Sequence, residues 1–244
     1  MAAIEPTPAA PAPLPAPSPG DATAAGWFYD SRRGVHYTKP VMRGWLHLLW
    51  FTASLGISGV LLARAHGNAR VASVAVYAAS VSALFGVSAL YHCGTWSDTW
   101  RRRLQRLDHA MIFFLIAGTA TPTFVVATGG GIGVAGLIAL WTLTGTAAAI
   151  HMAWMNAPER LVGGTFIALG WVAALALPEV WVHSGAVPGA LMVAGCLLYL
   201  TGAISYHFRW PDPFPSVFGY HEVFHVFVCA AAACQYAAIA LYIV

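Results

Sequence analysis

Charged side chains are scarce in this sequence. Of its 244 residues only 9% are Asp, Glu, Lys or Arg, whereas 59% are hydrophobic. A soluble domain carries about 25% charged residues, so the composition excludes a soluble globular protein. Cysteine is scarce too: the four cysteines lie within or at the ends of apolar segments and show no regular spacing. This pattern excludes a disulfide scaffold.

Long apolar segments are what the sequence does contain. Each is long enough to cross roughly 30 Å of hydrocarbon, and clusters of Gly, Asn, Ser and Pro separate them. We therefore predict an all-α membrane protein, a seven-transmembrane-helix bundle that crosses the plasma (inner) membrane several times and has the lipid bilayer as its environment. The predicted spans are residues 42–63, 71–92, 107–127, 131–154, 160–178, 187–207 and 220–243.

The composition divides the chain into three regions. Residues 1–25 are mostly Pro and Ala, which cannot pack a core, so we expect a disordered, partly polyproline tail. Residues 26–40 combine aromatic and basic side chains, which is typical of the lipid headgroup zone and predicts an interfacial segment. Residues 41–244 form the predicted transmembrane domain.

Lysine and arginine are distributed unequally between the two sides of these spans. Ten of the twelve lie on the side of the N-terminus, and only Arg64 and Arg70 lie on the other. The positive-inside rule then predicts a cytoplasmic N-terminus and a C-terminus outside. This topology also explains the arginine run 101–103, so we do not expect nucleic acid as a partner.

Two histidines stand four residues apart at the start of the last span. On a helix His221 and His225 share one face, at a spacing that allows two imidazoles to hold one metal ion. Ionisable groups at membrane depth are rare and usually functional. For this pair alone, two histidines that are simply hydrogen-bonded at a helix end are an equally open interpretation.

Other polar residues fall at the same depth in the predicted topology. Ser88 and His92 end the second span, Asp108 begins the third, and all lie at the inner end with His221 and His225. Three imidazoles and a water form a zinc site with one exchangeable position, although copper, nickel or iron also accept nitrogen ligands. We predict zinc bound by His92, His221 and His225. Asp108 and Ser88 would orient or deprotonate the water.

Three stretches of the sequence, Ser88–His92, Leu107–Pro122 and Pro211–His225, carry a family resemblance. The chain resembles the hemolysin III family, the bacterial branch of the progestin and adipoQ receptor group, which is related to alkaline ceramidases. The resemblance covers about residues 40–244. It implies a seven-helix bundle with its N-terminus inside, and zinc on the residues that match His92, His221 and His225, with the counterpart of Asp108 beside it.

The sequence also departs from the family pattern. Bacterial members often have Glu and Asn ahead of a Thr-His pair in the first span, whereas this chain keeps only His47. Many members have Tyr where Ala120 stands, and a histidine near Gln235. Whether His47 contributes to the site is left open by the sequence.

Two functions of different classes follow from these residues. The first is a zinc-dependent hydrolase of a membrane lipid amide or ester, with Asp108 as general base and Ser88 hydrogen-bonded to the water or an oxyanion. The second is a lytic, channel-like or signalling membrane protein without enzymatic activity, in which the zinc is structural, as the family name suggests.

A protease is a weaker third hypothesis. Residues His221–His225 match the H-E-x-x-H motif, in which Glu222 would be the general base. No Asp, Glu or His follows His225, so the downstream third ligand of many such proteases is missing. Glu222 also lies about 100° from the histidine face of a helix.

Overall fold

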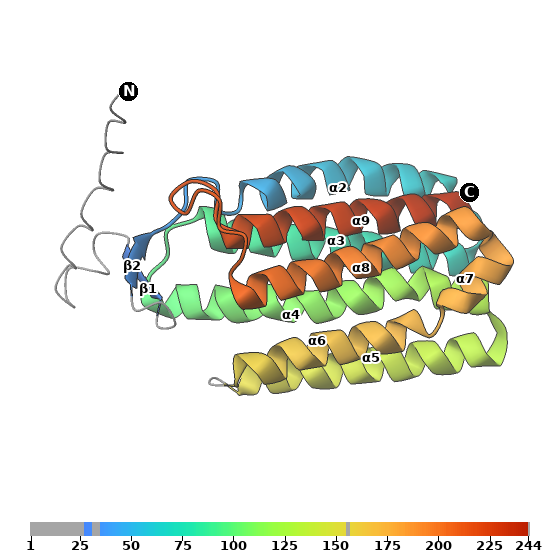
Figure 1. Cartoon of the computed structure of the whole chain (residues 1–244). Helices are drawn as coiled ribbons and strands as arrows, with labels where there is room; N and C mark the ends of the chain where they lie inside the picture. The colour runs from blue at the N-terminus through green and yellow to red at the C-terminus, as the bar shows by residue number, and fades with distance from the viewer. Residues whose placement is uncertain (1–26, 31–34, 155–156, 244) are drawn as a thin grey trace, which may run out of the picture.

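Seven helices that are long and apolar enough to cross a membrane dominate the structure. The computed structural model describes residues 27–30, 35–154 and 157–243, so the predicted tail 1–25 lies outside the described residues. The helices run side by side as one elongated bundle (Figure 1), which confirms the predicted all-α seven-helix fold.

The spans agree with the predicted ones except in two places. α4 begins at Asp98 rather than near residue 107, because the arginine-rich stretch before the apolar segment is helical as well. The fifth span is interrupted near Pro178 and forms two helices. The elements are α2 (Trp45–Arg64), α3 (Asn68–Cys93), α4 (Asp98–Pro122) continued by the π-helix η1 (Thr123–Thr128), α5 (Gly130–Ala153), α6 (Glu159–Ala174), α7 (Leu177–Ser184), α8 (Ala186–Phe208) and α9 (Tyr220–Ile243).

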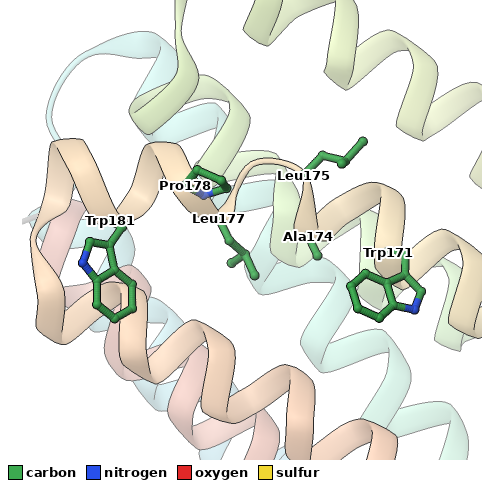
Figure 2. A pocket seen from close by; sticks show the side chains of 6 residues that line it. All are labelled: Trp171, Ala174, Leu175, Leu177, Pro178 and Trp181. Atoms are coloured by element: carbon green, nitrogen blue, oxygen red, sulfur yellow. The ribbon is translucent and has the colours of Figure 1, made fainter.

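The break between α6 and α7 shapes a shallow apolar pocket of about 460 Å³ (Figure 2). Trp171 and Trp181 flank it, and Ala174, Leu175, Leu177 and Pro178 complete its lining. α7 lies at the end of the bundle where α9 finishes, away from the start of α9 (Figure 1). The pocket is therefore remote from the predicted metal site.

The distribution of side chains is that of a protein surrounded by lipid. Large apolar residues such as Leu55, Ile138 and Trp171 are exposed, while polar residues such as Ser54 and Thr144 are completely buried. Some of these buried groups have partners inside the bundle: the Ser54 hydroxyl, for example, donates to the Phe51 carbonyl oxygen at 2.7 Å, whereas the Thr144 hydroxyl has no partner among the described residues. Apolar residues outside and polar residues inside are what a hydrocarbon solvent favours.

A two-stranded hairpin precedes the bundle, within the predicted interfacial segment. β1 (Trp27–Asp30) and β2 (Val35–Thr38) pair antiparallel, with Trp27 opposite Thr38 and Asp30 opposite Val35. Neither strand was predicted from the sequence, in which the aromatic and basic residues indicated only an interfacial segment. The hairpin lies at the end of the bundle where α2, α4 and α9 begin (Figure 1).

The orientation of the bundle in the membrane remains a prediction. The start of α2 and the end of α9 lie at opposite ends of the bundle (Figure 1), as an odd number of spans requires. Reporter fusions at the two termini should place the N-terminus in the cytoplasm and the C-terminus outside. A cytoplasmic C-terminus would contradict the prediction, and deletion of residues 1–25 should leave insertion unchanged.

Candidate metal centre

Three histidines approach one another where α3 ends and α9 begins. One ring nitrogen each from His92, His221 and His225 lies within 4.8 Å of the other two. The His221 ring centroid lies 4.7 Å from that of His92 and 4.6 Å from that of His225. The three residues form a cluster that is able to bind a metal ion, as their sequence spacing indicated.

The hydrogen bonding of His225 fits metal ligation. His225 is 2% exposed, and its Nδ1 has no hydrogen-bond partner among the residues that the structure describes. An unpartnered buried nitrogen is costly, and a metal ion would satisfy such an atom. Tetrahedral zinc holds nitrogens at about 2.0–2.1 Å, which sets them roughly 3.3 Å apart. In the cluster the three ligand nitrogens lie within 4.8 Å of one another.

Asp108 and Ser88 lie beside this cluster. The Asp108 Oδ2 atom, on α4, is 3.7 Å from His92 Nε2, and its side chain is 13% exposed. Ser88 lies one turn before His92 on α3, is buried, and lies close to Asp108. The structure thus brings together all five residues that the sequence singled out, and their roles remain predictions.

His47 of α2 is a further residue of this group. Its Nδ1 lies 2.8 Å from Ser88 Oγ, and its ring stacks on the His225 ring with centroids 3.7 Å apart. The ring edge also faces Phe85, at 5.0 Å between centroids. The sequence left open whether His47 contributes to the site, since it lies near the inner end of the first span and matches the family pattern there, but the sequence did not indicate these partners.

The segment before α2 is hydrogen-bonded both to the end of α3 and to the residues just before α9, the two helices that carry the three histidines. Its backbone N–H groups at Val41 and Met42 donate to the carbonyl oxygens of Ser216 and Val217, at 3.1 Å each, just before α9. Lys39 Nζ donates to the Gly94 carbonyl oxygen at the end of α3, 3.2 Å away. Partial burial of the ammonium group lowers the pKa of Lys39, because charge is less well hydrated there.

Gly44 allows this segment to approach His92 closely. Its φ of +88° is in the left-handed region, and a Cβ there would lie 2.7 Å from His92 Cβ and 2.9 Å from Cys93 Sγ. Only glycine fits at this position, because any other residue would bring a Cβ into these contacts and would be strained at this φ. The start of α2 can therefore pack directly against a predicted metal ligand.

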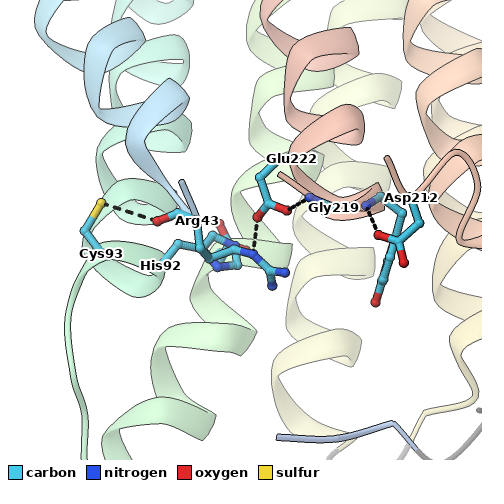
Figure 3. Close-up of polar contacts among 8 residues, drawn as sticks. Arg43, His92, Cys93, Asp212, Gly219 and Glu222 are labelled. Carbon is cyan, nitrogen blue, oxygen red and sulfur yellow. Dashed lines mark hydrogen bonds and ion pairs between the residues drawn. The ribbon is translucent and has the colours of Figure 1, made fainter. Parts of the chain in front are cut away.

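Glu222 fixes the start of α9 (Figure 3). Its side chain is completely buried, one carboxylate oxygen pairs with Arg43, and the other accepts the Gly219 N–H at 2.8 Å. This glutamate, three residues after the N-cap position, caps the helix as in a capping box. Asp212 Oδ1 accepts the next backbone N–H, that of Tyr220, at 2.9 Å. Because both Glu222 oxygens are engaged, the structure argues against Glu222 as the general base of a protease.

We expect Glu222→Gln to destabilise the protein and weaken its metal retention. The change leaves the largely buried Arg43 without its counter-ion, and breaking a buried pair in this way costs about 3–5 kcal/mol. The measurements are the melting temperature and the metal content in detergent. Glu179→Gln is the control, because its pair with His183 is exposed and is worth about 1 kcal/mol at most. A Glu222→Gln variant of unchanged stability that had lost a peptidase activity would instead support the protease hypothesis.

Comparison with known proteins agrees with the architecture. The model of the family described as "Haemolysin-III related" matches residues 35–236. The chain is 27% identical over 186 residues to "Hemolysin-3" of Bacillus cereus, covering 75% of this chain and 81% of that protein. It is 25% identical over 186 residues to "Hemolysin-3 homolog" of Bacillus subtilis (strain 168), covering 76% and 84% respectively. With its seven membrane-spanning helices, the chain belongs to the haemolysin-III-related family and is a multi-pass membrane protein, for which the plasma membrane is the expected location.

Proposed function

We propose that the protein is a zinc-dependent hydrolase that acts on an amide or ester bond of a membrane lipid. The observation that carries this proposal is the meeting of three imidazoles, a carboxylate and a hydroxyl at one end of an otherwise apolar bundle. Polar groups at membrane depth are costly, so a cluster of this kind supports a function at that position.

Each residue has a role in this proposal. His92, His221 and His225 would hold the ion. Zinc bound by three histidines supplies an open coordination position and a Lewis acid that lowers the pKa of water to about 7. Asp108, whose Oδ2 lies 3.7 Å from His92 Nε2, would accept the proton as general base. Ser88, which lies close to Asp108, would hold the water or an oxyanion by a hydrogen bond.

The depth of the cluster supports a lipid as the substrate. In the sequence, Asp108 and His221 stand where apolar stretches begin, a position that would correspond to the level of the lipid headgroups and the first carbons of the acyl chains. Amide and ester carbonyls of membrane lipids lie at this boundary. A lipid would therefore present its scissile bond to the site without leaving the bilayer.

The test is a purification in mild detergent without chelators, followed by metal analysis and a hydrolysis screen over lipid amides and esters. We expect about one zinc per chain and turnover of at least one lipid class. Turnover should disappear when the metal is removed and return when zinc is added. Full zinc occupancy with no turnover of any lipid would count against the hydrolase.

A second candidate is a lytic or channel-like protein in which the metal has a structural role. The observation that favours it is the name "Hemolysin-3" of the Bacillus cereus relative. Reconstitution in vesicles loaded with a fluorescent dye tests this function. Dye release by the wild-type protein without lipid hydrolysis would favour it.

A further inference from the structure

The break between α6 and α7 leaves a backbone carbonyl group without its helical partner. In an uninterrupted helix the N–H of residue 178 would donate to the Ala174 carbonyl oxygen, but Pro178 has no N–H. Within the described part of the chain, the backbone hydrogen bonds at the break go to the carbonyl oxygens of Val172, Ala173 and Ala176. The Ala174 carbonyl oxygen is therefore available as an acceptor.

This acceptor belongs to an apolar pocket inside a membrane span. Ala174 and Pro178 both line the pocket that Trp171 and Trp181 flank (Figure 2). The break falls within Arg160–Ser184, a segment long and apolar enough to cross a membrane. Backbone polar groups surrounded by hydrocarbon require a hydrogen-bond partner. The pocket therefore favours a molecule that brings a donor.

The lining of the pocket limits which molecule could bring that donor. None of its six lining residues has a charged side chain, and an unpaired charge in apolar surroundings is very costly. The lining therefore disfavours a phosphate or ammonium headgroup. Trp171 is 69% exposed, so the pocket opens to the surrounding lipid. An apolar chain gains little by moving from lipid to such a pocket, so selection depends on the hydrogen bond.

The neighbouring residues of α7 indicate the depth of the pocket. Glu179, directly after Pro178, pairs with His183 at 3.1 Å, and both side chains are exposed. Ionisable side chains avoid hydrocarbon, and tryptophan is enriched at the level of the lipid headgroups. The pocket therefore lies near the boundary between headgroups and acyl chains, which is where a neutral lipid holds its hydroxyl group.

We propose that this pocket binds a neutral lipid alcohol, whose hydroxyl group donates a hydrogen bond to the Ala174 carbonyl oxygen while its chain packs between Trp171 and Trp181. The pocket lies at the end of the bundle opposite the start of α9 and the three-histidine cluster (Figure 1). The inference is therefore independent of the proposed hydrolase. It gives the break in the fifth span a function in lipid binding.

The experiment uses the full-length protein in mild detergent and native mass spectrometry, which counts the lipid molecules bound to each chain. Two probes are titrated: a dialkylglycerol, which has one free hydroxyl group, and its methyl ether, which has none. Both probes have the same chains and lack amide and ester bonds. Hydrolysis at the metal centre therefore cannot alter the result.

We expect the wild type to bind the dialkylglycerol about tenfold more tightly than the methyl ether, the effect of one hydrogen bond. Pro178→Ala supplies the missing N–H for the Ala174 carbonyl oxygen and should abolish this preference. Pro188→Ala is the matched control. Pro188 lies in the first turn of α8, where backbone N–H groups have no partner within the helix, so its replacement should leave the preference unchanged.

Trp171→Ala is a second variant, which removes one wall of the pocket and keeps the break. Because Trp171 is exposed to lipid, the change should leave the fold intact and weaken binding of both lipids alike. Trp154→Ala is its control: Trp154 is also exposed, follows the end of α5 and does not line the pocket. That replacement should change neither affinity.

Equal affinities of the wild type for the two lipids would overturn the proposal. A tenfold preference that persisted in Pro178→Ala would overturn the role of the Ala174 carbonyl group, and equal losses in Trp171→Ala and Trp154→Ala would overturn the position of the site. A dimer that dissociated in Trp171→Ala, without any lipid preference in the wild type, would assign the pocket to a second copy of the chain instead.

Discussion

Replacing His221 or His225 with alanine should reduce the metal content of the purified protein from about one ion per chain to almost none. Either change leaves two imidazoles, and a two-ligand site exchanges its metal readily with the solvent. The His225 change also removes the ring on which His47 stacks. Elemental analysis of protein purified without chelators provides the measurement.

His151→Ala is the matched control for this experiment. His151 lies in the last turn of α5, and its ring contacts His109 and Phe113 instead of the three-histidine cluster. Its replacement should leave the metal content unchanged. A wild-type protein that contained almost no metal would remove the basis of the centre, and equal loss in the control would point to a general defect in folding.

Asp108→Asn should lower lipid hydrolysis by about 10²–10⁴-fold, the usual effect of removing a general base. Asparagine keeps the shape of the side chain and a hydrogen-bonding group for Ser88, so metal content and melting temperature should stay close to those of the wild type. Ser88→Ala should have a smaller effect on turnover, because it deletes hydrogen bonds worth about 1–3 kcal/mol and leaves the base in place.

The same variant separates the two candidate functions. If the metal is structural, Asp108→Asn should lower metal retention and melting temperature together. A variant with full metal, unchanged melting and unchanged turnover would exclude Asp108 as the base. The three quantities should therefore be measured on the same preparation of each variant.

The number of spans and the convergence of the five polar residues followed from the sequence for a simple reason. Hydrophobic length identifies each span, and the alternating direction of successive spans assigns Ser88, Asp108 and His221 to one end of the bundle. Spacing by four residues then places His221 and His225 on one helix face. These arguments need only distance along the chain.

Contacts that depend on how the helices are rotated and packed could not be obtained in this way. Arg43 and Glu222 are 179 residues apart in the sequence, and only the folded bundle shows that they pair. The stacking of His47 on His225 likewise depends on how α2 and α9 face each other. The break after Ala174 and the early start of α4 were missed because hydropathy records where a segment is apolar, and not where its helix begins or ends.

The placement of the cluster on α3 and α9 has a consequence for biosynthesis. α9 is the last helix of the described chain to leave the ribosome, and it carries two of the three histidines. A nascent chain that has inserted its first six spans therefore has only His92 of the three, and a single imidazole binds a metal ion weakly. If the cluster binds a metal ion as proposed, its capture would come late in assembly, because the three histidines do not meet until α9 packs between α2 and α8. Truncated or wrongly inserted chains would remain without metal.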